Sequence, residues 1–320
     1  MELLTDRYEL HLGDCHDVLA GMGERSVDMC LTDPPYFFLG MNVDWDADKI
    51  NESVKEWRAE NQDREKRHGN RFLEMSLGYE KGGGSTYGSE KTIEFYHFMK
   101  KVSDAIYRVL KPGSFYFAFS QPRLVHRMMD AIEDAGFNIR DLMIWYHPNG
   151  SPSRAMSLDR HVDDRYGNEG ERAELIKSME NRKTPVPAVL YEPIVFAQKP
   201  PEGSLIDNWK KYGVGLMDMN TKSGGILPSN VLYFNKPLGV KNKHSWNNHP
   251  TVKPLDLIEY LIYTYSKEGD VILDPFLGSG TTVVASINQR RKGIGIEKAS
   301  AYFDICKGRV AEALMESRLF

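Results

Sequence analysis

The sequence predicts an α/β fold in which helices cover both faces of a parallel sheet. Short apolar runs alternate with longer stretches of helical periodicity toward both ends of the chain, which is the pattern of such a sheet. The length of 320 residues and the apolar content of 41% allow a sizeable core and at most two compact modules. Between residues 147 and 248, scattered prolines and glycines break the alternation. We therefore expect one fold assembled from both ends of the chain, with a smaller module inserted between them.

Each element follows from a run and from the residues that end it. Strands are expected where short apolar runs end at glycine, aspartate or proline, and helices where apolar residues recur every three or four positions. Pro34 and Pro35 end the second strand, and Lys111-Pro112-Gly113 ends the first long helix. The polar stretch 37–89 is expected to form a mobile surface flap. The expected strands are 8–12, 27–32, 114–119, 141–146, 271–273 and 293–296, and the expected helices are 93–110, 124–135, 255–265, 281–288 and 301–316.

The charge balance offers no bulk positive charge as the sign of a nucleic-acid partner. Lysine and arginine number 41 against 45 aspartates and glutamates, so the net charge is −4. A nucleic acid would therefore have to meet a local basic surface. The stretch 219–255 contains lysines but no aspartate or glutamate, and it is the one plausible surface of this kind.

Cysteine usage and hydropathy favour the reducing cytosol. Cys15, Cys30 and Cys306 lie far apart without metal-ligand spacing, and the chain opens with a charged stretch instead of an apolar signal core. His244 and His249 have no third ligand at a matching spacing, so no metal is expected. No apolar run approaches the ~20 residues that span a bilayer. We expect a cytoplasmic location and no membrane partner.

A glycine-rich turn between a buried strand and a helix is the strongest local motif. The strand ends at Asp274 and turns through Gly278 and Gly280 into a helix. Glycines at such a turn let the backbone approach a ligand and put free helix N–H groups beside it. Val283 at the third glycine position excludes the dinucleotide G-x-G-x-x-G motif, and no lysine follows the turn as a P-loop requires.

A second acid suggests which ligand this turn binds. The next strand ends at Glu297, where a carboxylate could accept hydrogen bonds from both hydroxyls of a ribose. Two acids around a cleft, Asp274 and Glu297, suit a cationic nucleoside better than a pyrophosphate. S-adenosylmethionine, which carries a sulfonium and an ammonium, is the cofactor that this pattern indicates.

The tetrapeptide Asp33-Pro34-Pro35-Tyr36 stands at the end of another strand, where open α/β sheets place their active sites. An exocyclic amine on a nucleobase is a poor nucleophile because its lone pair is delocalised into the ring. The Asp33 carboxylate and the Pro34 carbonyl supply two acceptors that would hold the amine hydrogens and free that lone pair. Tyr36 supplies a ring on which a base rotated out of a duplex would stack. The tetrapeptide thus indicates chemistry on a base amine.

Together, the motifs resemble the β-class DNA amino-methyltransferases. The matching segments are LGDC at 12–15, LTDPPY at 31–36, RVLKPG at 108–113, HPTVKP at 249–254, LDPFLGSGTT at 273–282 and IGIE at 294–297. In that class the catalytic tetrapeptide precedes a target-recognition region and the cofactor motifs come last, a circular permutation of the usual methyltransferase order. The resemblance does not extend to 147–248 or to the flap.

The resemblance implies a Rossmann-like, doubly wound methyltransferase fold with circularly permuted order and an inserted target-recognition region. Residues 1–146 would be the catalytic half that carries the tetrapeptide, and residues 147–248 the target-recognition region. Residues 249–320 would be the S-adenosylmethionine-binding half of the same catalytic domain.

The resemblance also implies a role for each matching position. Asp33 and the Pro34 carbonyl would bind the target amino group while Tyr36 stacks on the flipped base. Asp14 would bind the cofactor's adenine amino group, the alternative being a plain helix N-cap. Lys253 would lie near the cofactor's carboxylate, the alternative being a surface or phosphate-binding lysine. The pocket would be completed by Asp274, Phe276, Gly278, Gly280 and Thr281 at the methionine end, Thr251 near the carboxylate and Glu297 on the ribose.

The leading functional hypothesis is a site-specific DNA adenine N6-methyltransferase. In the family, aspartate at the first tetrapeptide position goes mostly with adenine, and serine mostly with cytosine N4. Cytosine-N4 methylation is the alternative, and an RNA base methyltransferase is weakly disfavoured by the long middle region. An inactive DNA-binding protein is disfavoured by the intact tetrapeptide, and a small-molecule or protein methyltransferase by the motif order.

Sequence specificity is expected in 147–248. Trp145 or Tyr146 could form the opposite wall of the base pocket, with core packing as the alternative. The family often dimerises, but the sequence fixes neither a homodimer nor a cognate restriction endonuclease, and the setting would be a bacterium, an archaeon or a phage-infected host cell. Candidates for phosphate or base contacts to double-stranded DNA, each with a solvated-surface alternative, are Arg154, Lys236, Lys241 and Lys243.

Overall fold

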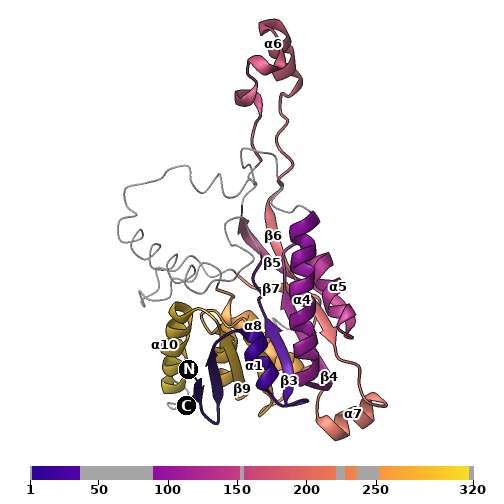
Figure 1. The fold of residues 1–320 in the computed structure, drawn as a ribbon, viewed down its shortest axis with the longest axis vertical. Coiled ribbons are helices and arrows are strands. Elements are labelled where there is room, and N and C mark those ends of the chain that lie inside the picture. The colour runs from indigo at the N-terminus through magenta and orange to yellow at the C-terminus, as the bar shows by residue number, and fades with distance from the viewer. Residues whose placement is uncertain (1, 37–88, 152–154, 221–227, 236–251, 317–320) are drawn as a thin grey trace.

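The computed structural model describes residues 2–36, 89–151, 155–220, 228–235 and 252–316 (Figure 1). The predicted flap, 37–89, lies outside these ranges except for its last residue. Within them, the alternation of strands and helices at both ends of the chain forms one sheet with helices on both faces.

A nine-stranded mixed sheet lies at the centre of the described part, in the order β1-β2-β9-β8-β3-β4-β6-β5-β7. Strands β2, β9, β8, β3 and β4 are mutually parallel, whereas β6 runs antiparallel to both β4 and β5. The parallel block brings the carboxyl ends of β3, β8 and β9 to the same edge. The strands are β1 (Glu2–Leu4), β2 (Tyr8–Leu12), β3 (Val27–Thr32), β4 (Leu110–Phe119), β5 (Asn138–Ser151), β6 (Val189–Gln198), β7 (Val231–Tyr233), β8 (Val271–Asp274) and β9 (Lys292–Glu297).

Helices cover both faces because side chains alternate along the central strands. On β4, Tyr116 packs in one apolar cluster with residues of α1, α4 and α5, whereas Phe115 and Phe117 pack in another with residues of α8. None of the described helices is long and apolar enough to cross a membrane. The helices are α1 (Cys15–Gly21), α4 (Ser89–Val109), α5 (Val125–Asp134), α6 (Glu169–Ser178), α7 (Leu205–Tyr212), α8 (Leu255–Tyr265), α9 (Thr281–Asn288) and α10 (Ser300–Glu316).

The bounds of β2, β3, α8 and α9 are the predicted ones, and those of β8 and β9 differ by one residue at one or both ends, but β4 and β5 differ more and β1, β6 and β7 were not predicted. Strand β4 begins at Leu110 and not at 114. Val27 pairs with Leu110 while Met29 pairs with Phe115, so a bulge absorbs Pro112 and the residues around it. Strand β5 extends beyond the predicted 141–146 in both directions, and the edge strand β1, three residues long, was not predicted.

The middle region is not a module apart from the sheet. Strands β6 and β7 both fall within 147–248, and β5 crosses its first residues. Pro193, one of the prolines that suggested irregular structure, lies inside β6, where its carbonyl accepts from the Ser120 N–H. The predicted boundary at 147 is therefore corrected. Outside the sheet, the region adds helix α7 and the arm, residues 155–188, which carries α6.

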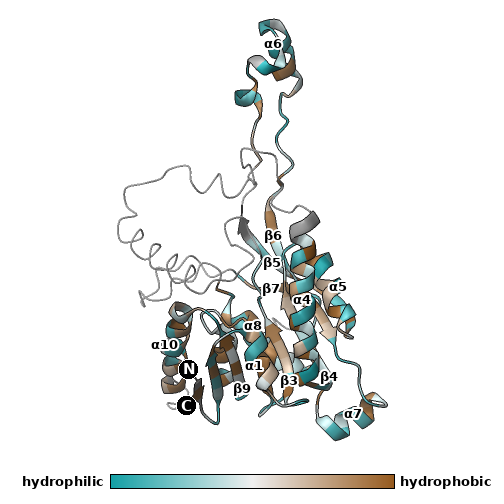
Figure 2. Cartoon of the chain, viewed as in Figure 1, coloured by the Kyte–Doolittle hydropathy of each residue, from teal (hydrophilic) through white to brown (hydrophobic). Residues whose placement is uncertain are grey.

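The arm projects from the body with α6 at its tip, at the opposite end of the molecule from α7 (Figure 1). Asn168 and Glu171 form a capping box at the start of α6. No residue of α6 is buried, and hydrophilic and hydrophobic residues alternate around it (Figure 2). Local hydrogen bonds, and not burial, therefore hold this helix.

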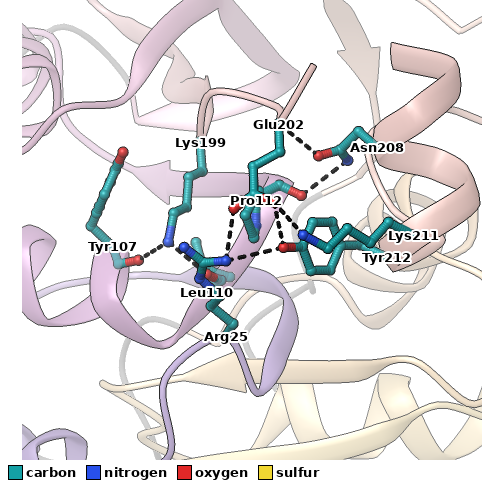
Figure 3. A network of polar contacts seen from close by, with 9 residues as sticks. All are labelled: Arg25, Tyr107, Leu110, Pro112, Lys199, Glu202, Asn208, Lys211 and Tyr212. Carbon is teal, nitrogen blue, oxygen red and sulfur yellow. Dashed lines mark hydrogen bonds and ion pairs between the residues drawn. The ribbon is translucent and has the colours of Figure 1, made fainter. Parts of the chain in front are cut away.

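A polar network fastens helix α7 to the end of the sheet opposite the arm (Figure 3). Glu202 accepts from Arg25 at 2.7 Å and from Lys211 at 2.6 Å. The buried Asn208 amide donates to the Pro112 carbonyl of β4 at 3.0 Å. This cluster lies away from the carboxyl ends of the strands, so it provides a comparison for the ion pairs found there.

Candidate active site

The carboxyl ends of β3 and β8 lie side by side, and this brings the two predicted motifs together. The strands are parallel neighbours, with Cys30 opposite Leu273. Just beyond this pair, Thr32 Oγ1 donates to Asp274 Oδ1 at 2.6 Å. The residue before the tetrapeptide thus binds the acid that opens the glycine-rich turn, across 242 positions of sequence.

Asp274 is buried and connects β3, the turn and α9. Its Oδ1 also accepts from the Phe276 N–H at 3.0 Å, and its Oδ2 accepts from Thr282 Oγ1 at 2.7 Å. Burial raises the pKa of Asp274 to about 6 in spite of these bonds. Because these donors are neutral, they leave the negative charge of the ionised carboxylate uncompensated.

The turn itself depends on two glycines with positive φ. Gly278 has φ of 54° and Gly280 has φ of 89°. Gly280 is the N-cap of α9, and a Cβ there would lie 2.5 Å from Cys306 Sγ on α10. The close packing of α9 on α10 therefore excludes a side chain at this position.

Arg309 of α10 braces the turn, and sequence reasoning missed it. Its guanidinium donates to the Ser279 carbonyl and to Ser279 Oγ, both at 2.8 Å, and to Thr281 Oγ1 at 3.0 Å. The hydroxyl of Thr281, a predicted cofactor contact, is thus bound within the turn. No local pattern marks Arg309, since it lies 30 positions from Ser279 in the sequence.

Glu297 ends β9 beside the turn, as predicted, and it too is buried. Its Oε2 accepts from the Gly278 N–H at 2.8 Å and its Oε1 from the Ala299 N–H at 2.7 Å. Burial raises the pKa of Glu297 to about 7. Among the described residues, no lysine or arginine forms an ion pair with Glu297 or Asp274. These two carboxylates therefore favour the approach of a cation.

Asp14 is the N-cap of α1, which was the alternative to a cofactor contact. It accepts from the His16 N–H at 2.9 Å and from Lys298 Nζ at 3.1 Å. Partial burial alone would raise its pKa, but these two donors outweigh it and the pKa is lowered. Asp14, Cys15 and His16 bring three potential metal-ligand atoms together in the described part of the chain. Burial raises the pKa of the Cys15 thiol to about 12, which disfavours the thiolate that a metal would need.

Asp33, the first residue of the tetrapeptide, is held by two donors. The Tyr36 hydroxyl donates to Oδ1 at 2.6 Å, and Lys253 Nζ donates to Oδ2 at 2.6 Å. Tyr36 is half-buried against the apolar cluster of α4. The hydroxyl contact was not predicted, and stacking of the Tyr36 ring on a base remains a prediction.

Lys253 lies between two acids, and only one of them was expected at the site. Its side chain is 10% exposed, which contradicts a surface role, and its Nζ lies 3.2 Å from Glu192 Oε2 on β6. The other Glu192 oxygen lies 4.0 Å from Nε2 of the buried His147 on β5. Sequence reasoning missed Glu192 and His147 because both lie in the region that was assigned to a separate module.

The aromatic residues near the site divide between core and rim. Trp145 is 2% exposed, and its indole N–H donates to the Phe234 carbonyl at 2.8 Å. Its alternative of core packing is therefore confirmed. Phe276 is half-buried, with its ring 5.8 Å from that of Phe98 on α4.

Several predicted contact residues lie outside the described ranges. They are Arg154, Lys236, Lys241, Lys243 and Thr251. Of the lysines in the acid-free stretch 219–255, Lys253 is the one that the structure describes, and it is committed to Asp33 and Glu192. The DNA-contact assignments therefore stay predictions.

Comparisons with known proteins agree on one family. A sequence profile described as DNA methylase, N6_N4_Mtase, matches residues 27–308. Type II methyltransferase M.HindIII of Haemophilus influenzae is 31% identical over 231 residues, which cover 71% of this chain and 73% of that protein. Type II methyltransferase M.HpaI of Haemophilus parainfluenzae is 25% identical over 297 residues, covering 91% of this chain and 70% of that protein.

Solved structures show the same fold. PvuII DNA methyltransferase, described as cytosine-N4-specific, matches with a TM-score of 0.58 at 14% identity, covering 95% of this chain and 86% of that one. The complex of M1.HpyAVI with SAM matches with a TM-score of 0.53 at 18% identity, covering 95% and 98%. At these identities the likeness concerns the fold alone.

Proposed function

The chain belongs to the N6/N4 family of DNA methylases, and on that premise we propose that it methylates the exocyclic N6 amine of adenine at specific sites in duplex DNA. The family depends on S-adenosylmethionine, which is also bound in related folds such as M1.HpyAVI and the Thermus thermophilus protein TTHA0409. The Type II names of the relatives support a role in restriction-modification, with a cognate endonuclease as partner.

One observation carries the proposal: the hydrogen bond from Thr32 to Asp274. It puts the tetrapeptide and the glycine-rich turn at adjacent strand ends, so an amine held by the first would lie beside a ligand held by the second. Methyl transfer requires this juxtaposition, because holding both reactants in contact supplies much of the rate.

The turn fits the cofactor. Gly280 leaves no room for a side chain, and the donors that the described part of the chain gives Asp274 and Glu297 are all neutral, so a cation beside these carboxylates stabilises their ionised forms. S-adenosylmethionine would supply a methyl group on a positively charged sulfur: the amine nitrogen would form a bond to the methyl carbon, the carbon–sulfur bond would break with its electron pair left on sulfur, and one amine proton would pass to solvent. We propose that Phe276 and the turn line the methionine end, with Glu297 toward the ribose.

The tetrapeptide would prepare the target amine. Each carboxylate oxygen has two lone-pair sites, so Asp33 can accept from the amine while it keeps a donor of its own. The Pro34 carbonyl is the second acceptor, and Pro35 fixes its direction. Tyr36 would give up its bond to Asp33 and stack on the base, which has to leave the duplex to reach the site.

The choice of adenine over cytosine N4 is supported by the aspartate at position 33. The test is to incubate the enzyme with labelled S-adenosylmethionine and unmethylated duplex DNA, digest the DNA to nucleosides and separate them. We expect the label in N6-methyladenine. Label in N4-methylcytosine alone would replace the adenine assignment, and equal labelling of RNA would replace the DNA assignment.

We propose that target recognition lies within residues 147–248, where the arm and the lysine-rich stretch both fall. Phosphate contacts make binding salt-dependent, with a slope that follows the number of contacts. Replacing Lys241 and Lys243 by alanine should reduce the slope of DNA affinity against salt, measured by titration from low to high ionic strength. An unchanged slope would move the DNA-binding surface elsewhere.

A further inference from the structure

Behind the tetrapeptide lies a small group of charges in which one cation is shared by two acids. Lys253 Nζ is 2.6 Å from Asp33 Oδ2 and 3.2 Å from Glu192 Oε2. The Phe119 ring of β4 covers the ammonium, 5.0 Å from its centroid. Lys253 therefore has no access to the solvation that an exposed lysine would have, and depends on the two carboxylates.

The backbone of Glu192 lies in a paired strand, whereas those of Asp33 and Lys253 lie outside the strands. It lies on β6, inside the sheet, opposite Trp145 of β5. Its two oxygens face different partners, Oε2 toward Lys253 and Oε1 toward Nε2 of His147. Asp33, in contrast, follows the end of β3, where no ladder fixes the backbone. Glu192, on a paired strand, thus holds Lys253, and Lys253 holds Asp33, whose backbone no strand ladder fixes.

We propose that Glu192 is a positioning residue that acts through Lys253, holding its ammonium so that Asp33 stays oriented and free to accept the target amine. This rests on the proposed function of the site. Without Glu192, Asp33 would be the one counterion left to the ammonium among the described residues, and the closed pair would compete with the amine for the carboxylate oxygens. With Glu192, the charge is shared and one Asp33 oxygen can change partner.

The groups that face Lys253 set the direction of its titration. They are Asp33 and Tyr36 after β3, Glu192 on β6 and, through Glu192, His147 on β5. Burial alone would lower the pKa of Lys253, but Asp33 and Glu192 outweigh it and the pKa is raised. Removing the charge of Glu192 should therefore lower the pKa of Lys253 and move the alkaline loss of activity to lower pH.

The test uses the full-length enzyme with Glu192→Gln, Lys253→Met and the double variant. We expect Glu192→Gln to reduce kcat by about tenfold to a hundredfold, with the KM for DNA within about threefold of wild type, since a group that acts on the reacting carboxylate changes the transition state more than ground-state binding. The double variant should be no slower than Lys253→Met, because Glu192 acts only through that lysine. Wild-type kcat in Glu192→Gln, or additive losses in the double variant, would overturn the proposal.

The matched control is Glu202→Gln. Glu202 also accepts from a lysine at 2.6 Å, and lies in the network that fastens α7, away from the site (Figure 3). The kcat of the Glu202→Gln enzyme should stay within about twofold of wild type, as expected when an exposed ion pair away from the site is lost. Glu192→Asp keeps the charge and should recover part of the lost rate together with the wild-type alkaline limb. If Glu192→Gln does not fold, the aspartate variant still decides: a kcat below wild type with the wild-type alkaline limb is expected, and a wild-type kcat with a displaced alkaline limb would overturn the proposal.

A readout without DNA separates this inference from the proposed function. The side-chain ammonium of Lys253 can be titrated by nitrogen-15 NMR and assigned by its loss in Lys253→Met. A lower pKa in Glu192→Gln than in wild type is expected, and an unchanged pKa would overturn the inference even if DNA is methylated. If wild-type enzyme methylates no DNA, the proposed function fails whatever this titration shows.

Discussion

The two halves of the candidate active site hold their acids in opposite ways. At the glycine-rich turn, the proposed cofactor side, Asp274 and Glu297 are buried and bound by hydroxyl and backbone N–H donors. On the tetrapeptide side, Asp33 is bound by an ammonium and a phenol. Neutral donors satisfy the hydrogen-bonding capacity of a carboxylate but leave its charge, whereas the ammonium compensates the charge as well.

This difference matches what each half has to bind. A cationic ligand gains most beside acids whose charge is uncompensated, and a neutral amine needs an acceptor oxygen that keeps a free lone pair. The same residue type therefore serves two tasks, and its surroundings determine which. The predictions below test this division of roles, beginning with the largest effect.

Asp33→Ala should abolish methyl transfer while cofactor affinity stays nearly unchanged. The variant removes the acceptor for the amine, and we expect a loss of roughly a thousandfold, the upper range for deleting one group that stabilises a transition state. Labelled methyl transfer measures the rate, and calorimetric titration with S-adenosylmethionine measures binding. A parallel loss of affinity would mean that the two halves are not separate.

Gly280→Ala should damage the cofactor half instead. The variant combines a strained φ of 89° with a Cβ 2.5 Å from Cys306 Sγ, so we expect the free energy of unfolding to fall by about 1–3 kcal/mol and cofactor affinity to fall with it. Gly269→Ala is the matched control, because its φ is 84° but nothing lies within 4 Å of the added Cβ. Adding Cys306→Ala to Gly280→Ala should recover part of the loss. Equal losses of stability and cofactor affinity in Gly269→Ala and Gly280→Ala would show that backbone strain alone, without the contact to Cys306, causes the loss.

Cofactor affinity should decrease in acid. A bound cation requires ionised carboxylates, and burial raises the pKa of Glu297 to about 7 and that of Asp274 to about 6. Affinity should therefore fall by about tenfold per pH unit below the pKa of Glu297, with proton release on binding that calorimetry in different buffers can measure. In Glu297→Gln the decrease should begin only near pH 6. A flat profile in wild type would show that neither acid meets the cation.

The same raised pKa values have the opposite effect on the stability of the protein without ligand, which they favour at low pH. Both carboxyl groups have a higher pKa in the folded chain than the ordinary values of 3.8 and 4.5, so the folded state binds protons more tightly. This contribution to stability is fully present below pH ~4 and is lost as the pH rises through the folded-state values. Urea unfolding between pH 5 and pH 8 measures both effects. Without cofactor, this contribution to stability should fall as the pH rises, whereas the stability added by the cofactor should increase with pH.

Asp14→Ser should have the smallest effect on stability, and it tests whether Asp14 binds the cofactor or only caps α1. Serine is as good an N-cap as aspartate, so the unfolding temperature should stay close to wild type, whereas Asp14→Ala should cost about 1 kcal/mol. If Asp14 also binds the cofactor's adenine, Asp14→Ser should weaken cofactor binding by about fivefold, the value of one hydrogen bond. Unchanged affinity would leave Asp14 as the cap of α1 alone.

The parallel half of the fold could be predicted from sequence because its elements end at residues with strong local preferences. β3 ends before Pro34 and Pro35, and α9 begins at Gly280, so both were predicted at their observed bounds. Strand β6 was missed because Pro193 and its neighbours suggested a loop. A strand that has partners on both sides can hold a proline whose carbonyl, and not its missing N–H, is used in the ladder.

The site was predictable only where a motif carries the chemistry by itself. Asp274 and Glu297 each end a strand and Asp33 directly follows one, and the topology of a parallel sheet places such ends together. Glu192 and Arg309 act by contacts with residues far away in the sequence, so no spacing marks them. Lys253 was found by its motif, but its partners were not, because which acids surround a lysine is a tertiary property.

The pairing of β3 with β8 also governs when the site comes into existence. Thr32 leaves the ribosome long before Asp274, its partner 242 positions later, so one side of β3 stays without its β8 neighbour until those residues are made. Such distant pairings fold slowly and leave a buried strand uncovered in the meantime. Chains that end before β8 would have the tetrapeptide but no turn beside it, so an incomplete chain could not modify DNA. Methylating capacity therefore requires a chain made at least as far as the glycine-rich turn.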